Sequence, residues 1–360
     1  MSDGLPLSSH IESIQARLAA YLGTRIAYFR MLASGWETTV YEFALETRSH
    51  RCADLPVHMP LVLRCYQEPR AAMKGGREAG VMRLLAASNY PIPRVFLFEE
   101  NCEPLDSPFL IMERVSGSPL FSNRPFLRAF KTFSMGFVAF VRAQAQLHSL
   151  GTDGQIAPVN VPRAYTSSNA PAELPLLERL FRIIERRIEE APLPGLKEAL
   201  IALRTRAPRY SPACSTIVHM DYHPQNVMVS GPRVRGVLDW VNADFGDRYL
   251  CAATTAVILS TSAMDRPRWM RENAVGNALR KLFASLYLPL YHAARPIEIE
   301  RFRFAQGVAA LLRLSMFGMM RSRGPQSVGF RPAAIENVTP SVLRLLSRYA
   351  SRKTGVPVAI

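Results

Sequence analysis

Three side chains that carry oxygen ligands stand close together in the segment IVHMDYHPQNVMV and in the VLDW that follows it. Asp221 and Asn226 are five residues apart, and Asp239 follows Asn226 after thirteen more. Short apolar runs of β type, at Val227 to Val229 and Val234 to Leu238, separate Asn226 from Asp239. Because a hairpin brings the ends of its strands together, we expect Asn226 and Asp239 to lie side by side. An amide oxygen and a carboxylate are ligands that suit Mg²⁺.

The remaining carboxylate, Asp221, is expected beside this metal site, where it can accept a proton from a hydroxyl group. Phosphoryl transfer needs this combination, because a metal neutralises the phosphates and a carboxylate receives the proton of the nucleophile. The alternative is a polar loop that caps a hairpin, with Asp221 and Asn226 bonded to the backbone. The whole set of residues, at fixed offsets between apolar strands, favours catalysis.

The elements that must position these residues are predicted from hydrophobic periodicity. A leading helix is expected at 9–22, followed by a β-rich region with one helix, and then by a mostly helical remainder from residue 126. In the β-rich region we expect strands at 26–32, 38–45, 61–65, 95–98 and 109–115, a hairpin turn at 34–35 and a helix at 78–86. The fold class is therefore α+β, with a small antiparallel sheet lobe at 1–115 and a larger helical lobe at 116–360.

The string H-x-D-x-x-x-x-N followed by L-D-W resembles the aminoglycoside phosphotransferase and choline kinase family, whose fold is like that of protein kinases. The resemblance implies that Asp221 is the catalytic base and that Asn226 and Asp239 hold Mg²⁺. It implies ATP as the phosphate donor, bound between the two lobes, with GTP left open. It makes His219 a structural member of the catalytic loop.

The resemblance extends upstream of this string. LVLRCY resembles the strand that bears the phosphate-pairing lysine, but the matching residue is Arg64, whose planar fork can also pair phosphates. GGREAGVMRLLA resembles the helix that supplies the partner glutamate, which is Glu78 here. After FGD, where the family has a proline and then an aspartate, this chain has Arg248 and Cys251.

Two further segments complete the nucleotide site that the resemblance implies. PFLIMERVSG resembles the hinge, where the backbone around Met112, Glu113 and Val115 is expected to bind the adenine edge. LASGWETTVYEF stands at the place of the Gly-rich loop but has a single glycine, so Ser34, Gly35 and neighbouring N–H groups are expected to contact the phosphates.

The charge of the chain bears on the acceptor. The net charge is +15, and residues 249–360 hold 16 Arg and Lys against 5 Asp and Glu. Coulomb repulsion disfavours a polycationic acceptor such as an aminoglycoside, so we expect a neutral or anionic hydroxylated small molecule, or a bulky apolar one. The same charge motivates a nucleic-acid-binding alternative, which we do not favour because no long basic run is present.

The remaining features indicate a soluble protein of the cytoplasm. The five cysteines are widely spaced and form no CxxC pair, the N-terminus has no signal-peptide pattern, and no apolar stretch is long enough to span a membrane. Oligomeric state stays open. The alternative to an active kinase is a catalytically silent kinase-like protein that binds nucleotide, which the presence of Asp221, Asn226 and Asp239 disfavours.

Overall fold

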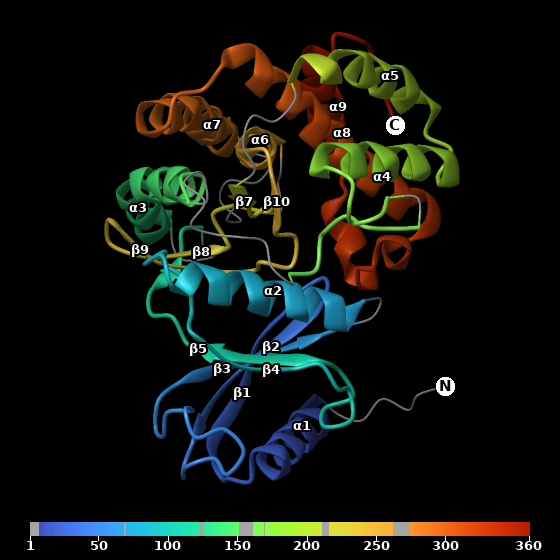
Figure 1. Cartoon of the computed structure of the whole chain (residues 1–360). Coiled ribbons are helices and arrows are strands. Elements are labelled where there is room, and N and C mark those ends of the chain that lie inside the picture. The colour runs from blue at the N-terminus through green and yellow to red at the C-terminus, as the bar shows by residue number, and fades with distance from the viewer. Residues whose placement is uncertain are drawn as a thin grey trace.

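The computed structural model describes residues 7–67, 70–121, 126–150, 161–168, 170–210, 216–261 and 274–360. Figure 1 shows a sheet-rich lobe built from the first part of the chain and a helical lobe built from the rest, so the predicted α+β class is confirmed. The sheet lobe contains α1 (Leu7–Leu22), β1 (Ile26–Ser34), β2 (Thr38–Leu45), β3 (Leu61–Tyr66), α2 (Ala71–Ala86), β4 (Val95–Glu99) and β5 (Phe109–Glu113).

The main sheet has five antiparallel strands in the order β1-β2-β3-β5-β4. Side chains of β3 alternate between its faces, as the pleat requires. Leu61 and Leu63 pack in the core that includes α1, whereas Val62 and Tyr66 pack in the core that includes α2. Arg64 lies on the same face of β3 as Val62 and Tyr66, which is the face that packs against α2.

The helix α2 begins at Ala71, seven residues before the predicted start at Glu78. Gly75 and Gly76 lower the helix propensity of this segment, which is why the sequence predicts a later start. In the structure a Cβ on Gly75 would overlap the ring of Phe98, so the glycine lets α2 lie close against the sheet. The predicted turn also shifts slightly, because Ser34 is the last residue of β1 and the turn follows it.

The helical lobe carries two small sheets among its helices. One pairs β6 (Ser118–Pro119), β8 (Val227–Ser230) and β9 (Arg233–Val237), and the other pairs β7 (Thr216–Val218) with β10 (Asp244–Gly246). The predicted β8–β9 hairpin is confirmed, whereas β7 and β10 are not predicted. The helices are α3 (Phe126–Leu147), α4 (Leu176–Glu190), α5 (Lys197–Arg206), α6 (Arg248–Thr261), α7 (Ala274–Ala294), α8 (Ile299–Arg323) and α9 (Pro340–Thr354).

The apolar core of the helical lobe continues into the sheet lobe through α2 and β5, so one buried cluster joins the two lobes. The helix α8 contacts α4, α6 and α9 and lies at the centre of the helical lobe. Cys251 stands where the family that the sequence resembles has an aspartate, and its side chain is fully buried in α6. Within the described residues, no helix is both long and apolar enough to cross a bilayer.

Candidate active site

The loop between β7 and β8 carries Asp221 and Asn226, and Asp239 follows β9. Val227 of β8 pairs with Val237 of β9, and the N–H of Leu238 donates to the carbonyl oxygen of Asn226 at 2.8 Å. This pairing puts Asn226 and Asp239 at the same end of the hairpin, as the sequence predicts. Asp239 has a φ of 66°, in the left-handed region, so the chain turns sharply where the hairpin ends.

The loop is braced by His219, whose side chain is fully buried. Burial lowers the pKa of His219 to about 4, so the ring is neutral at physiological pH. Its Nε2 lies 2.9 Å from the carbonyl oxygen of Leu238, and its Nδ1 accepts from the backbone N–H of Asp221 at 3.3 Å. The two partners select the tautomer with the proton on Nε2. His219 therefore ties the backbone of Asp221 to the strand that precedes Asp239.

The amide of Asn226 is oriented by a second hydrogen bond. Its Nδ2 donates to the backbone carbonyl oxygen of Asp221 at 3.1 Å. With the amide nitrogen facing the loop, the amide oxygen is left to face another partner. The carboxylate of Asp221 is about a third exposed, and its Oδ2 lies 3.8 Å from Nε2 of His223.

Arg64 connects the carboxylate of Asp239 to Glu78 of the helix α2. Its Nη2 lies 2.6 Å from Oδ1 of Asp239, and its Nε lies 3.2 Å from Oε2 of Glu78. Glu78 also accepts from the hydroxyl of Tyr66 at 2.6 Å and from the N–H of Trp240 at 3.2 Å. The predicted pair of Arg64 and Glu78 is thus in contact, and the arginine fork contacts two carboxylates through two different nitrogens.

The charges in this pair are set by burial and by one another. Burial alone lowers the pKa of Arg64, but the carboxylates of Asp239 and Glu78 raise it above its ordinary value. Burial raises the pKa of Glu78, and the Arg64 charge opposes that rise. A fully buried carboxylate of this kind depends on its cation for stability.

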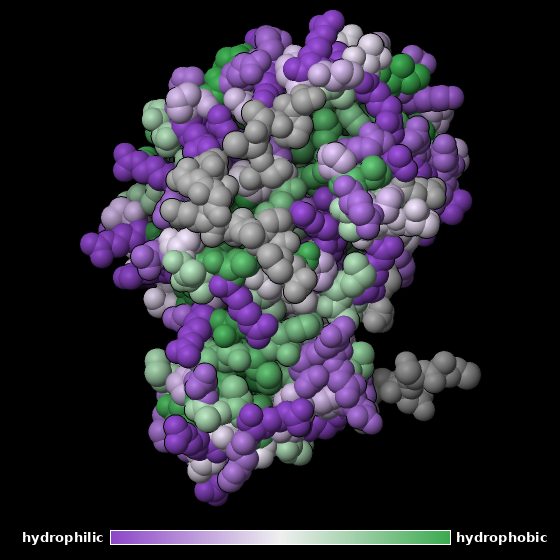
Figure 2. All heavy atoms as spheres, in the orientation of Figure 1, coloured by the Kyte–Doolittle hydropathy of each residue, from purple (hydrophilic) through white to green (hydrophobic). Residues whose placement is uncertain are grey.

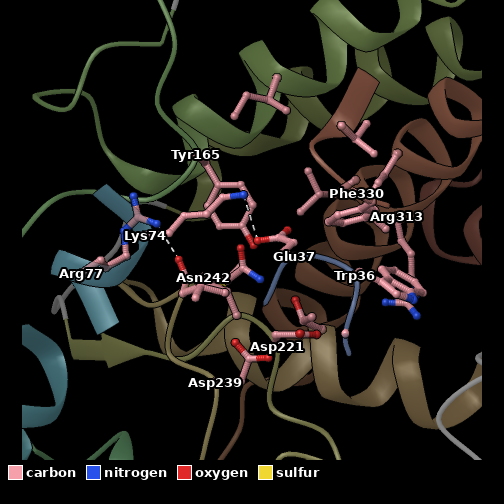
Figure 3. A pocket seen from close by; sticks show the side chains of 18 of the residues that line it. Trp36, Glu37, Lys74, Arg77, Tyr165, Asp221, Asp239, Asn242, Arg313 and Phe330 are labelled. Carbon is pink, nitrogen blue, oxygen red and sulfur yellow. Dashed lines mark hydrogen bonds and ion pairs between the residues drawn. The ribbon is translucent and has the colours of Figure 1, made fainter. Parts of the chain in front are cut away.

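A cavity of about 490 Å³ lies between the lobes and collects most of these side chains. Figure 3 shows Asp221 and Asp239 near its floor, with Glu37, Lys74 and Tyr165 above them. Of the predicted site residues, five line the cavity: Gly35, Arg64, Asp221, Asn226 and Asp239. An interlobe cavity of this size can hold a nucleotide phosphate chain and an acceptor hydroxyl next to a carboxylate base.

The other predicted residues do not line this cavity. Ser34 does not reach it, because its hydroxyl accepts from Arg331 of the helical lobe. At the hinge, the N–H of Glu113 already donates to the carbonyl of Arg94 at 2.9 Å, and the carbonyl of Val115 accepts from Arg114 at 2.7 Å.

Glu78 lies behind Arg64, and Met112 is buried in the middle of the sheet. The predicted nucleotide contacts of Ser34, Met112, Glu113 and Val115 therefore stay predictions.

The cavity also holds an ion pair that the sequence reasoning missed. Glu37, in the β1–β2 turn, lies 3.0 Å from Nζ of Lys74 on α2. Burial raises the pKa of Glu37, and the Lys74 charge opposes that rise. The late predicted start of α2 left Lys74 and Arg77 outside any expected element. The spacings of three residues from Lys74 to Arg77 and of four residues from Lys74 to Glu78 were the signal that could have placed all three on one side of a helix.

The β1–β2 turn is held from the helical lobe by a second group that was not predicted. Phe330 packs on Trp36 with ring centroids 4.9 Å apart, and the N–H of Arg331 donates to the carbonyl of Trp36 at 2.9 Å. The Arg331 guanidinium donates to Thr39 at 2.6 Å, to Gln67 at 2.8 Å and to Ser34. We name Phe330 and Arg331 the turn clamp, since they fix the turn that lines the cavity.

The residues present fit a divalent metal held partly by phosphates. In the described parts of the chain, no group of three His, Cys, Asp or Glu residues could hold a metal by itself. The Asn226 amide oxygen and the Asp239 carboxylate are two hard oxygen donors, and Mg²⁺ is commonly bound by one or two carboxylates together with substrate phosphates. The donor set therefore fits Mg²⁺ bound with a nucleotide.

Solved structures with a similar fold cover nearly the whole chain. A candidate aminoglycoside phosphotransferase from Ralstonia eutropha JMP134 has a TM-score of 0.61 at 16% identity, covering 94% of this chain and 98% of its own. Macrolide 2′-phosphotransferase MphH from Brachybacterium faecium has a TM-score of 0.55 at 14% identity, covering 91% and 98%.

Aminoglycoside phosphotransferase APH(4)-Ia, solved as a thermostable mutant with ADP and hygromycin B, has a TM-score of 0.51 at 17% identity, covering 91% and 99%. These likenesses show the kinase-like fold of aminoglycoside phosphotransferases, as the sequence predicts.

The comparison of sequences is consistent with this fold. No curated protein matches the chain. The model of the phosphotransferase enzyme family matches residues 29–297, which include most of β1 and the rest of the sheet lobe after it, the loop with Asp221 and Asn226, and the β8–β9 hairpin. Because this match spans well over half of the chain, the protein belongs to the phosphotransferase enzyme family.

Proposed function

We propose that this protein transfers a phosphoryl group from ATP, with Mg²⁺, to a hydroxyl group of a neutral or anionic small molecule. One observation carries the proposal, namely that Asp221, Asn226, Asp239 and Arg64 all line one cavity between the lobes. Family membership supports phosphoryl transfer. Proteins of similar fold have been solved with ADP and hygromycin B, and with ATP and streptomycin, which supports nucleotide use and a small acceptor.

In this proposal Asp221 accepts the proton of the acceptor hydroxyl as that oxygen attacks the terminal phosphorus of ATP, while the bond from this phosphorus to the bridging oxygen breaks and ADP leaves. The hydrogen bonds from His219 and Asn226 hold the backbone of the Asp221 loop, so the base is positioned before the acceptor arrives. His219 acts on position only, because its ring is neutral and both of its nitrogens are bonded to backbone groups. A preorganised base contributes about 10²- to 10⁴-fold to the rate of such a step.

On the nucleotide side, Asn226 and Asp239 are the residues that would hold Mg²⁺, which when bound neutralises charge on the phosphates. Arg64 keeps Asp239 in place and supplies positive charge to the phosphates from the sheet lobe. The backbone of Gly35 and the hinge at Met112 to Val115 complete the proposed nucleotide site. The proposal also takes residues 1–115 as the nucleotide lobe, residues 116–360 as the catalytic and acceptor lobe, and the cytoplasm as the location.

Phosphate transfer from labelled ATP to a panel of hydroxylated metabolites and antibiotics tests this proposal, with Asp221→Asn as the catalytic variant. We expect turnover of at least one acceptor and a loss of about 10²- to 10⁴-fold in kcat for the variant, while ATP binding persists. Asp106→Asn is the matched control, because Asp106 is a surface carboxylate that pairs with Arg17 and does not line the cavity.

If ATP and Mg²⁺ bind but no acceptor is phosphorylated, the silent nucleotide-binding alternative is favoured. Selective stabilisation by aminoglycosides would contradict a neutral or anionic acceptor.

A further inference from the structure

The wall of the cavity formed by the helical lobe is rich in arginine. The helix α4 contributes Arg186 and Arg187, and α8 contributes Arg313. Figure 3 shows Arg313 beside Phe330, on the side of the cavity away from Lys74 and Arg77. Among the described residues that line the whole cavity, seven are Arg or Lys and three are Asp or Glu.

Two of the three carboxylates in the cavity are already paired with cations of the sheet lobe. Glu37 lies at Lys74 and Asp239 lies at Arg64. Asp221 is the carboxylate proposed as the base. Seven basic residues against three acidic ones leave the described lining of the cavity with an excess of positive charge that these carboxylates do not balance.

Arg187 shows this excess of positive charge most clearly. Its Nη1 donates to the backbone carbonyl of Leu312 at 3.3 Å, its Nε has no hydrogen-bond partner, and no described carboxylate lies within 4.0 Å of it. Burial is the main reason that the pKa of Arg187 is lowered to about 10; the Arg186 charge acts in the same direction, while Tyr165 and Glu190 oppose it. Holding a half-buried cation beside a second cation costs free energy that an anionic ligand would offset.

The surfaces next to these arginines are apolar. Ile183 of α4, Val257 of α6, and Leu312 and Met316 of α8 line the same cavity. A ligand bound here would therefore meet fixed positive charge and an apolar wall together. Carboxylates and phosphates are the groups that an arginine fork binds with two parallel hydrogen bonds.

We propose that the phosphate acceptor is a partly apolar hydroxylated anion, whose carboxylate or phosphate group binds Arg187 while its apolar part packs on Leu312 and Met316. This inference rests on the proposed function, because it assigns the acceptor to the wall that faces the base Asp221. The shared chemistry is an anionic group on a hydroxylated, partly apolar body.

The test uses a matched series of probes with one medium-chain hydroxyalkyl body. The body carries a carboxylate, a phosphate ester, a primary amide or an amine. Binding is measured by calorimetry with Mg·ADP present, and phosphate transfer from ATP is measured separately. Since a charge-assisted hydrogen bond contributes more than a neutral one, we expect an anionic probe to bind about 10- to 100-fold more tightly than the amide, and the amine to bind least. The carboxylate and phosphate probes show which anion the site prefers.

Variants of Arg187 connect this preference to the site. Arg187→Met should remove the preference for the anion while leaving the KM for ATP within about twofold, and Arg187→Lys should restore part of it. Arg182→Met is the matched control. This substitution removes the same charge from α4, but Arg182 does not line the cavity. Thermal unfolding of each variant shows whether the fold is kept.

Three results would overturn the inference: the amide or amine binds as well as the anions, no anionic probe binds, or Arg187→Met raises the KM for ATP as much as it weakens the anion. Since binding is measured without turnover, an absence of phosphate transfer by any probe counts against the proposed function and leaves the binding result to decide this inference.

Discussion

Replacing Arg64 by Met tests the electrostatic centre of the proposed site. The substitution keeps an unbranched apolar stem but removes the cation that lies 3.2 Å from Glu78 and 2.6 Å from Asp239. The two carboxylates respond differently, because Glu78 is 1% exposed in its side chain and Asp239 is 30% exposed. Water can solvate Asp239 after the change, whereas Glu78 keeps only its bonds from Tyr66 and Trp240.

The size of the effect follows from this difference. Removing one partner of a buried ion pair costs about 3–5 kcal/mol, since the other charge stays buried without its partner. The exposed partner Asp239 adds little, because solvent-exposed pairs contribute about 0–1 kcal/mol. We therefore expect Arg64→Met to lower the free energy of unfolding by about 3–5 kcal/mol, most of it through Glu78.

Equilibrium urea unfolding at neutral pH measures this effect. The double variant Arg64→Met/Glu78→Gln should recover about 1–3 kcal/mol relative to the sum of the two single variants, since the pair is in direct contact. The effect of Arg64→Met should also shrink as the pH falls toward 4, because burial raises the pKa of Glu78 and protonation then removes the unpaired charge.

A matched control is available on the neighbouring part of the sheet. Arg30 lies 2.7 Å from Glu42, but its side chain is 64% exposed. Arg30→Met should change the free energy of unfolding by about 1 kcal/mol or less. If Arg64→Met costs no more than Arg30→Met, or if the double variant shows no coupling, the reasoning about the buried pair is wrong.

Three other perturbations have defined outcomes. Burial lowers the pKa of His219 from 6.5 to about 4, so the unfolded chain binds the proton more tightly and stability should fall as the pH drops from about 6.5 to about 4. In a series of thermal melts, His219→Gln should make stability depend less on pH over this range. Glu37→Gln removes the carboxylate paired with Lys74, and the KM for ATP should fall about fivefold in steady-state assays. A rise in this KM would contradict the prediction. Arg331→Met releases the turn clamp, and the KM for ATP should rise severalfold with little change in urea midpoint, whereas an equal loss of stability would make the clamp structural only.

The distribution of hydrophilic residues on the surface bears on which partners the protein binds. Figure 2 shows hydrophilic residues scattered over both lobes on this face of the molecule, with no single patch that stands out. The arginines that matter for the proposed acceptor lie inside the cavity instead. Among the described residues that line the cavity, Arg313 is the one basic residue from the basic last third of the chain, so the proposed anion site depends mainly on Arg187 of α4.

The amino-acid sequence determined the parts of the site that are local in the chain. Asp221, Asn226 and Asp239 were identified because the loop and hairpin that carry them are contiguous, and the strand pairing of β8 with β9 follows from two apolar runs and a turn. The α+β class followed in the same way from the change of period between the first third and the rest. Hydrophobic periodicity is written into short segments, so it can be read without knowing what those segments pack against.

The tertiary structure alone decided which distant side chains meet. The fork of Arg64 contacts Asp239, which is 175 residues further along the sequence, and Arg331 reaches Ser34 across 297. The helix α2 includes Gly75, where the ring of Phe98 leaves no room for a Cβ atom. The packing of α2 on the sheet outweighs the low helix propensity of glycine. Arg187 comes to line the same cavity as Asp221 because α4 packs on α8. These contacts depend on how preformed elements fit together in space, and no local pattern in the chain encodes that fit.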